Sequence, residues 1–423
     1  MTLPVATPGE RAHLQHRTIT ALRMVQVPGQ AAVAGVVAVS ALLASDLLGS
    51  DALAGSAGAS FTIGSALTAV PLSAFMRRRG RRPGLVRAFS IGAVGALVAV
   101  AGGQTRLFGL YLAGMVLFGA GQAATLQSRY AAADLAEPEH RARAIAAVVW
   151  IGTLGAVFGP LLTPFEKDVA EAVGLDRLVG PVAFAAALFA IAALVAWWRL
   201  RPDPLAAAGA LDPEAERVHP LHHVRSSYRT ISASRAAVLG LTAMVVSQTA
   251  MVAVMTMTPP HMKDHGHADM SAYVIALHIV GMYGFAPLVG RISDRIGRVR
   301  AIGAGAAVLG MGTVTTVVGG YVPALVFVGL LLLGVGWSFG LIAGSALLTE
   351  SVDADGRVEV QGTADLTMSL CGGAAAFASG FVKQAWGYHL LANAATAAAA
   401  LLIVATWWLR ARAVPSRPAY PPA

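Results

Sequence analysis

Apolar residues along the chain form long runs that are separated by short breaks rich in charge, proline or glycine. Twelve runs can be read, near residues 24–48, 54–76, 84–104, 107–128, 142–164, 179–199, 236–258, 271–290, 300–320, 323–348, 360–382 and 387–409. Many reach the ~20 residues that an α-helix needs to cross about 30 Å of hydrocarbon. Helices satisfy their backbone hydrogen bonds internally, as a bilayer requires. The pattern therefore predicts an all-α polytopic membrane protein with twelve transmembrane helices.

The longest polar stretch of the chain separates the sixth apolar run from the seventh. It extends from Arg201 to Arg235 and contains several acidic residues, prolines and arginines. We therefore expect an N-terminal six-helix bundle in residues 1–200, a cytoplasmic linker in 201–235 and a C-terminal six-helix bundle in 236–423.

The composition narrows the class of protein. Of the 423 residues, 56% are hydrophobic and 13% are charged, whereas soluble globular proteins carry about 25% charged residues. This excludes a soluble enzyme or a nucleic-acid-binding protein, despite a net charge of +9. The single cysteine, Cys371, excludes a disulfide framework. No catalytic signature occurs, so we expect neither an enzyme nor a cofactor, but a monomer with the lipid bilayer as partner.

The positions of the basic residues predict the orientation in the membrane. Twelve spans place both termini on one side, and Lys and Arg accumulate on the cytoplasmic side. Of the 31 basic residues, 26 fall on the side of the termini and the linker. The five on the other side are Arg106, Lys167, Arg177, Lys263 and Lys383. We expect a multi-pass protein of the cytoplasmic (inner) membrane with both termini in the cytoplasm.

Two loops half a chain apart repeat one pattern. The loop after the eighth run reads Gly-x-x-x-Asp-Arg-x-Gly-Arg, with its signature residues at Gly290, Asp294, Arg295, Gly297 and Arg298. It resembles the cytoplasmic loop signature of the major facilitator superfamily. The loop after the second run aligns with it, but has Ser73 in place of the first glycine and Arg77 in place of the aspartate.

This resemblance covers the whole chain. It implies two pseudo-symmetric six-helix bundles around a central site that opens alternately to each side of the membrane. It also implies a gating function for the loop from Gly290 to Arg298.

The seventh and eighth runs contain side chains that are unusual for membrane helices. Met251 and Met255 are four residues apart, as are His278 and Met282, so each pair shares one helix face. At about 1.5 Å per residue, Met251 and His278 lie at similar depths, ~10 Å inside the membrane. Thioether and imidazole groups suit a soft cation, above all Cu(I). The spacing predicts a metal site formed by these four residues.

The loop between these runs adds three histidines, His261, His265 and His267, which we expect to gather metal on the outer face. Each feature has a plainer explanation. A Met-x-x-x-Met pair commonly fills gaps in a core, an intramembrane histidine can relay protons or accept a structural hydrogen bond, and loop histidines can be solvated. Their coincidence on one helical hairpin favours the metal site.

The same hairpin resembles the CcoA-type copper importers within the superfamily. The shared features are the two Met/His motifs, the segment from Thr258 to His267, and the run from Arg129 to Asp134. The resemblance implies secondary active import of copper, as an ion or small chelate, by alternating access. The additional cysteines of that subfamily are reduced here to Cys371.

A rival function is a proton-coupled exporter of small organic molecules. It is favoured by the Gly155-x-x-x-Gly159-Pro160 element, which also fits simple close packing of helices, and by Gln122, Gln127 and Gln248 within the spans. A non-transporting membrane metallosensor is less consistent with the complete gating loop.

Proton coupling has three candidate residues in the sequence, Asp365 within the eleventh run, and Asp134 and Glu350 at helix ends. Intramembrane carboxyl groups often bind protons. Ion pairing with Arg129 or Arg357 is the structural alternative.

Overall fold

The computed structural model describes residues 8–49, 55–215, 220–267, 270–319 and 322–411, and this part of the chain contains helices, turns and no strand. Twelve of its helical segments are long and apolar enough to span a membrane, which confirms the predicted fold class. In the first half they are α1 (Pro8–Leu48), α2 (Ser56–Arg79), α3 (Arg81–Gln104), α4 (Phe108–Ala133), α5 (Arg141–Ala172) and α6 (Gly180–Arg199). In the second half they are α9 (Arg235–Asp264), the broken helix α10–η5–α11 (Ser271–Ile279, Val280–Gly284, Ala286–Ile296), α12 (Arg298–Val318), α13 (Pro323–Glu350), α14 (Ala354–Trp386) and α15 (Tyr388–Ala411).

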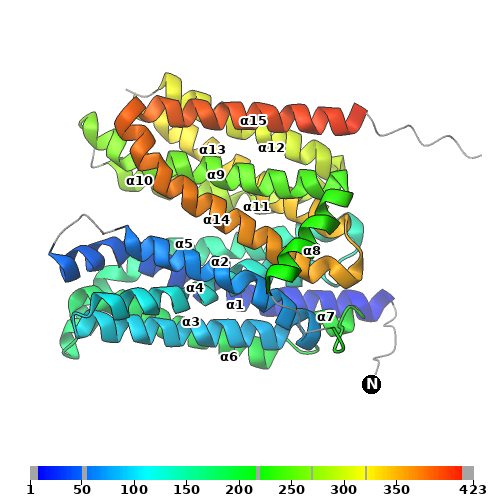
Figure 1. Cartoon of the computed structure of the whole chain (residues 1–423), viewed down its shortest axis with the longest axis horizontal. Helices are drawn as coiled ribbons and strands as arrows, with labels where there is room; N and C mark the ends of the chain where they lie inside the picture. Colours follow the sequence, from blue (N-terminus) through cyan, green and yellow to red (C-terminus); the bar gives the residue numbers. More distant parts are fainter. Residues whose placement is uncertain (1–7, 50–54, 216–219, 268–269, 320–321, 412–423) are drawn as a thin grey trace, which may run out of the picture.

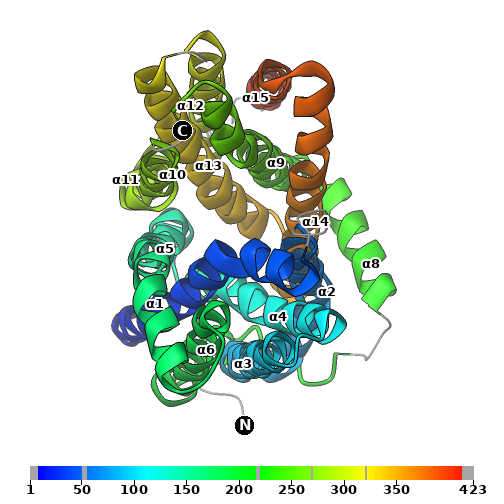
Figure 2. The same cartoon turned by 90° about the vertical axis from the view of Figure 1, so that its left-hand side faces the viewer.

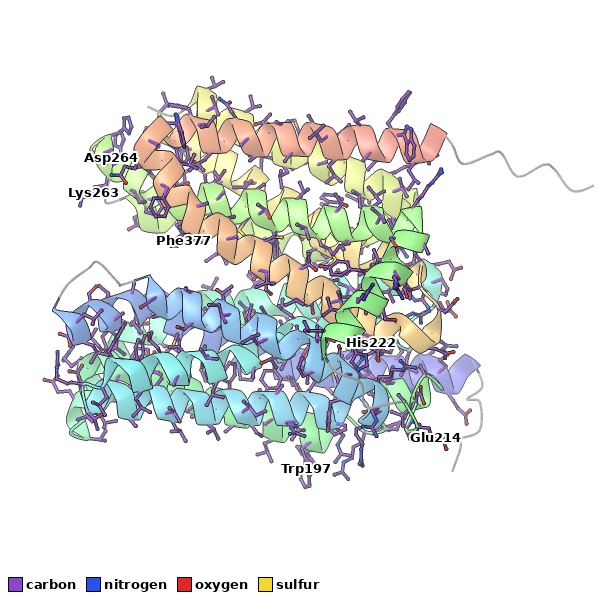
Figure 3. All side chains as sticks on the ribbon, in the orientation of Figure 1. Trp197, Glu214, His222, Lys263, Asp264 and Phe377 are labelled. Atoms are coloured by element: carbon purple, nitrogen blue, oxygen red, sulfur yellow. The ribbon has the colours of Figure 1, made fainter. Side chains whose placement is uncertain are left out.

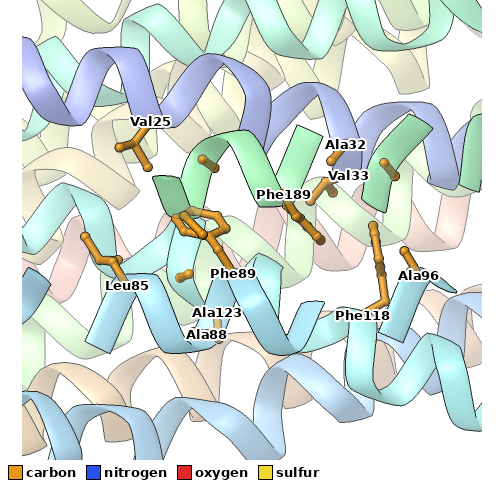
Figure 4. Close-up of a cluster of buried hydrophobic side chains, with 14 of the residues drawn as sticks. Val25, Ala32, Val33, Leu85, Ala88, Phe89, Ala96, Phe118, Ala123 and Phe189 are labelled. Atoms are coloured by element: carbon orange, nitrogen blue, oxygen red, sulfur yellow. The ribbon is translucent and has the colours of Figure 1, made fainter. Parts of the chain in front are cut away.

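The helices form two bundles that lie side by side (Figures 1 and 2). Helices α1 to α6 make the first bundle, and α9 to α15 make the second. The first bundle has a core in which the ring of Phe189 contacts Phe89 and Phe118, at centroid distances of 5.7 and 4.8 Å (Figure 4). A second core, centred on α9, α11 and α13, extends onto residues of α4 and α5. The two bundles therefore share buried surface.

The segment between the bundles contains two short helices, α7 (Pro204–Ala207) and α8 (Pro220–Ala233). Helix α8 packs against α14, α2 and α9, so it contacts both bundles. We call the end of the molecule where α7 and α8 lie the linker end (Figure 1). The opposite end, where Lys263 and Asp264 lie in Figure 3, is called the far end. Two 3₁₀ turns, η2 (Pro138–His140) and η3 (Arg177–Val179), precede α5 and α6.

Glycines allow α5 to pack closely on α1. A Cβ atom added at Gly159 would lie 2.6 Å from the carbonyl oxygen of Ala31, and one added at Gly155 would overlap the carbonyl oxygen of Val27. Small residues at this spacing permit such close approach of membrane helices. Close packing therefore accounts for the Gly155-x-x-x-Gly159 element.

Two helices differ from the pattern of apolar runs. Helix α1 begins at Pro8, well before the first run at residue 24. Its polar first turns are held at the linker end, where Arg11 and Gln15 donate to the carbonyl oxygens of Leu135 and Ala132. The eighth span is broken by a π-helical turn at Val280–Gly284, a feature that often occurs at functional sites.

Candidate functional site

His278 is fully buried on α10 and points toward α13. Its Nδ1 lies 2.7 Å from the carbonyl oxygen of Leu330. A carbonyl can only accept, so Nδ1 carries a proton, and in the neutral ring Nε2 then carries the lone pair. That Nε2 is buried and has no hydrogen-bond partner among the described residues. Histidines that bind metals commonly donate their other N–H to a carbonyl, so the ring has the tautomer that a metal ligand needs.

The three predicted methionine ligands lie in or against one buried cluster. Met251 and Met282 are 4% and 7% exposed and belong to the core centred on α9, α11 and α13. Met255 is half-buried and packs against the same core. Helix α13 packs extensively against α9 and also contacts α10, η5 and α11. The sequence did not indicate α13, which supplies the carbonyl group that orients His278.

The outer histidines lie near the far end with an aromatic partner. The buried ring of His261 stacks on Tyr388 at 4.3 Å and lies 4.4 Å from the ring of His265. His389, at the start of α15, lies 6.0 Å from His261 and was not indicated by the sequence. His267 follows α9, and its backbone N–H donates to the carbonyl of Met262. Within the described ranges, no three His, Cys, Asp or Glu residues form a group that could hold a metal ion.

A group of aromatic and amide side chains lies between the bundles. Trp337 of α13 donates from Nε1 to Oε1 of Gln248 at 2.7 Å. Tyr283 of η5 meets the Trp337 ring edge-on at 5.5 Å. Gln30 of α1 lies beside the Tyr283 hydroxyl, so this group contains a residue of the first bundle. The sequence indicated only Gln248 among these four.

A buried ion pair joins α4 to α14 toward the linker end. Arg129 pairs with Asp365, whose side chain is 2% exposed. Gln127 donates to the second carboxylate oxygen of Asp365 at 2.9 Å, and Arg129 also donates to Ser345 of α13 at 3.2 Å. Tyr130 and Ser345 both donate to the sulfur of Met244 on α9. Asp365 thus has a counter-ion in the other bundle. This ion pair is the structural alternative to a proton site at Asp365.

A second buried arginine contacts the residues around this ion pair. Arg81, at the start of α3, donates to Asp134 at 2.8 Å, to Gln127 at 3.0 Å and to Gln361 of α14 at 2.6 Å. Burial raises the pKa of Asp134, and its pairing with Arg81 acts in the opposite direction. We call Arg81, Gln127, Arg129, Asp134, Gln361 and Asp365 the linker-end network.

The loop from Gly290 to Arg298 makes its own contact between the bundles. Asp294 accepts from the backbone N–H groups of Ala142 and Arg143, both at 3.2 Å, at the start of α5. A carboxylate at a helix N-terminus is electrostatically favourable. Asp294 also pairs with the side chains of Arg143 and Arg298, at 2.8 and 2.6 Å.

The other four residues of this signature lie in different surroundings. A Cβ atom at Gly290 would lie 2.6 Å from the Cβ of Ala146, so glycine permits close packing of α11 on α5. Gly297 has φ 86°, which favours glycine. Arg295 is exposed. Arg298 is buried and also pairs with Glu350 at 2.9 Å.

The corresponding loop at the end of α2 also contacts the other bundle. It does so with a basic residue, where the loop from Gly290 to Arg298 has the acidic Asp294. Arg77 of α2 pairs with Glu359 of α14 at 3.0 Å and with Asp212 of the linker at 2.8 Å. His223 of α8 contacts the same Glu359 at 3.1 Å. An arginine replaces the aspartate here because its partner is a carboxylate, whereas Asp294 binds a helix N-terminus. All described ion pairs between the two bundles lie toward the linker end.

Reversing the charge of Arg77 is expected to favour opening of the linker end. Arg77→Asp places a carboxylate beside Glu359 and Asp212, and the double variant with Glu359→Arg restores an opposite-charge pair. We expect a coupling energy of about 1–2 kcal/mol between the two positions. Spin labels on α2 and α14 at this end would report the opening as a longer distance. Equal opening in the single and double variants would contradict the pairing.

Comparison with known proteins agrees with this architecture. The model of the Major Facilitator Superfamily matches residues 29–376 and 241–422. The uncharacterised MFS-type transporter YdeG of Bacillus subtilis (strain 168) is 37% identical over 411 residues, covering 96% of this chain and 95% of that protein. The riboflavin transporter RfnT of Brucella anthropi is 27% identical over 332 residues, covering 78% of this chain and 80% of that protein.

Among solved structures, the fold is similar to that of a bacterial homologue of the iron transporter ferroportin in an outward-facing state. The TM-score is 0.73 at 14% identity, covering 93% of this chain and 100% of that one. At this identity the likeness concerns the fold alone. The family match and the level of identity to YdeG show the class of protein: this chain is a multi-pass membrane transporter, not an enzyme, and it belongs to the Major Facilitator Superfamily.

Proposed function

We propose that this transporter imports copper as Cu(I) by alternating access, with Met251, Met255, His278 and Met282 as its ligands. The observation that carries the proposal is the buried His278, whose Nδ1 proton is held by Leu330 while Nε2 has no partner among the described residues. An uncompensated polar atom in a membrane core is costly, and a bound cation would offset that cost.

The chemistry of the donors favours Cu(I) over harder cations. Thioether sulfur and neutral imidazole are soft or borderline donors, whereas Mg²⁺ and Mn²⁺ prefer carboxylates. The buried carboxylates Asp365 and Asp134 have arginine counter-ions. Copper, as a free ion or small chelate, is the cargo here and not a resident cofactor.

In this proposal the linker end faces the cytoplasm, with both termini on that side of the cytoplasmic membrane. The ion pairs at the linker end then hold the transporter closed to the cytoplasm. Copper enters from the far end past His261, His265 and His267, and leaves when the bundles rock and the linker-end network separates. Each chain works as a monomer, because each contains both bundles and the complete ligand set.

Asp365 and Asp134 enter this scheme as groups whose protonation would weaken the linker-end network. Neutral Asp365 would no longer balance the charge of Arg129, and neutral Asp134 would no longer balance that of Arg81. Protonation of either would favour opening of the linker end.

A second candidate function is transport of a small organic molecule, including proton-coupled export. Trp337, Tyr283, Gln248 and Gln30 provide ring faces and amide groups between the bundles. Ring systems with polar edges suit such a lining. The name of the relative RfnT, a riboflavin transporter, is consistent with this candidate.

Uptake into vesicles that contain the purified protein separates the two candidates. Radioactive copper, kept reduced, and radioactive riboflavin are supplied in parallel, with protein-free vesicles as control. We expect copper to accumulate and silver(I), another soft monovalent cation, to compete. Accumulation of riboflavin without copper would contradict the copper proposal and favour the second candidate.

A further inference from the structure

Glu166 is a buried carboxyl group far from the linker-end network. It lies on α5, six residues before that helix ends at the far end, and is 2% exposed. A Cβ atom added at Gly35 of α1 would lie 4.0 Å from its Oε2, and one added at Gly180 of α6 would overlap its backbone oxygen. The residue is therefore enclosed among α1, α5 and α6. Because helical side chains lean toward the helix N-terminus, its carboxyl group reaches inward from the far end.

One oxygen of the carboxyl group lacks the partner that a buried carboxylate needs. Its Oε2 has no hydrogen-bond partner within the described residues, and neither has Oγ1 of Thr163, one turn earlier. None of the described ion pairs includes Glu166, whereas Asp365 is paired with Arg129. An ionised group in such surroundings costs several kcal/mol. Burial without a counter-ion therefore favours the neutral, protonated form of Glu166 in this conformation.

The helices around Glu166 offer no compensating charge. Helix α1 has no charged residue between Arg23 and Asp46, and the charged residue of α6, Arg199, lies at the linker end. On α5 itself, Asp168 and Glu171 are exposed and pair with Arg177 of η3. Lys167 is half-buried and adjacent in the chain. Movement of this segment toward water would be enough to let Glu166 ionise.

Helix α5 connects this carboxyl group to the movement of the bundles. At the linker end, the backbone of Ala142 and Arg143 binds Asp294 of the other bundle. Between that contact and Glu166, α5 contains Pro160 and Pro164. A proline within a helix removes a backbone hydrogen bond and makes the helix easier to bend. Rocking of the bundles can therefore tilt the last turns of α5 and change the exposure of Glu166.

We propose that Glu166 binds the proton that couples transport to a proton gradient. It holds the proton while it is enclosed, and releases it when the far segment of α5 tilts toward water. This inference rests on the assignment as a transporter and not on copper as the cargo.

Infrared spectroscopy of the full chain in lipid vesicles tests the protonation directly, without any cargo. We expect a carbonyl stretch of a buried protonated carboxyl group that disappears as the pH is raised. Glu166→Gln, a neutral isostere of the protonated form, should fold normally and lack this titrating band. Glu171→Gln is the matched control on the exposed face of α5 and should keep it. An unchanged band in Glu166→Gln would overturn the proposal.

Transport provides the second readout. In vesicles, Glu166→Gln should still exchange labelled for unlabelled Cu(I) but should lose the stimulation of uptake by a proton gradient. Glu171→Gln should behave as the wild type. Gradient-stimulated uptake by Glu166→Gln at the wild-type rate would overturn the proposal. If the wild type moves no copper, the copper proposal fails, while the infrared result still decides the protonation of Glu166.

Discussion

Asp365→Asn should destabilise the closed linker end by about 3–5 kcal/mol, because it leaves the buried guanidinium of Arg129 without a counter-ion. The Arg129 side chain is 3% exposed, so water cannot replace the lost carboxylate. Gln127 would keep a partner, since an asparagine oxygen can still accept from its amide. We expect a lower unfolding temperature and a larger population with the linker end open, measured by thermal unfolding and by distances between spin labels on α4 and α14.

Two further variants test whether the effect of Asp365→Asn arises from the loss of its ion pair with Arg129. Asp355→Asn alters an exposed carboxylate in the first turn of the same helix and should change neither measurement. The double variant Arg129→Gln with Asp365→Asn removes both charges and should be more stable than Asp365→Asn alone. Equal stability of Asp365→Asn and the wild type would contradict a role for this pair in closure.

Copper uptake should be lost when Met255→Leu is combined with His278→Asn. Leucine keeps most of the volume of methionine, at a cost below about 1.5 kcal/mol. The asparagine amide can donate to the carbonyl oxygen of Leu330 in place of Nδ1, but it lacks the lone pair of Nε2. Protein levels should therefore stay normal while uptake falls to the background of protein-free vesicles.

The matched control for this double variant is Met257→Leu. Met257 is a half-buried methionine on the same helix, two residues beyond Met255 and therefore on another face. It should transport copper at the wild-type rate. Undiminished uptake by the double variant, at equal protein levels, would contradict the ligand assignment.

Hydropathy was sufficient to predict the fold, because each membrane helix needs an apolar run of nearly fixed length. It could not predict lateral packing. Arg81 reads as one of a cluster of cytoplasmic arginines, yet it is fully buried because three partners surround it. Glu166 lies two residues beyond the run 142–164 and beside Lys167 and Asp168, so it reads as part of a loop. In the structure α5 continues to Ala172 and encloses it.

The candidate site was predictable only in part, because a sequence pattern describes one helix and not its neighbours. Spacing by four residues predicts that a pair shares one face of an α-helix, but it does not identify the helix that lies opposite. That helix is α13, whose apolar sequence carried no signal for Leu330 as the partner of His278. Asp365 was visible as an intramembrane acid with Arg129 or Arg357 as a candidate partner, and the three-dimensional contact selects Arg129.

In the proposed mechanism, two kinds of neutral donor, thioether sulfur and the free nitrogen of His278, bind Cu(I) within this transporter. X-ray absorption at the copper edge of the purified protein, loaded with Cu(I) and washed, tests this claim most directly. We predict retained copper with sulfur neighbours and one imidazole nitrogen, both lost in the variant that combines Met255→Leu with His278→Asn. Copper bound through oxygen and nitrogen alone, or no retained copper, would contradict the claim.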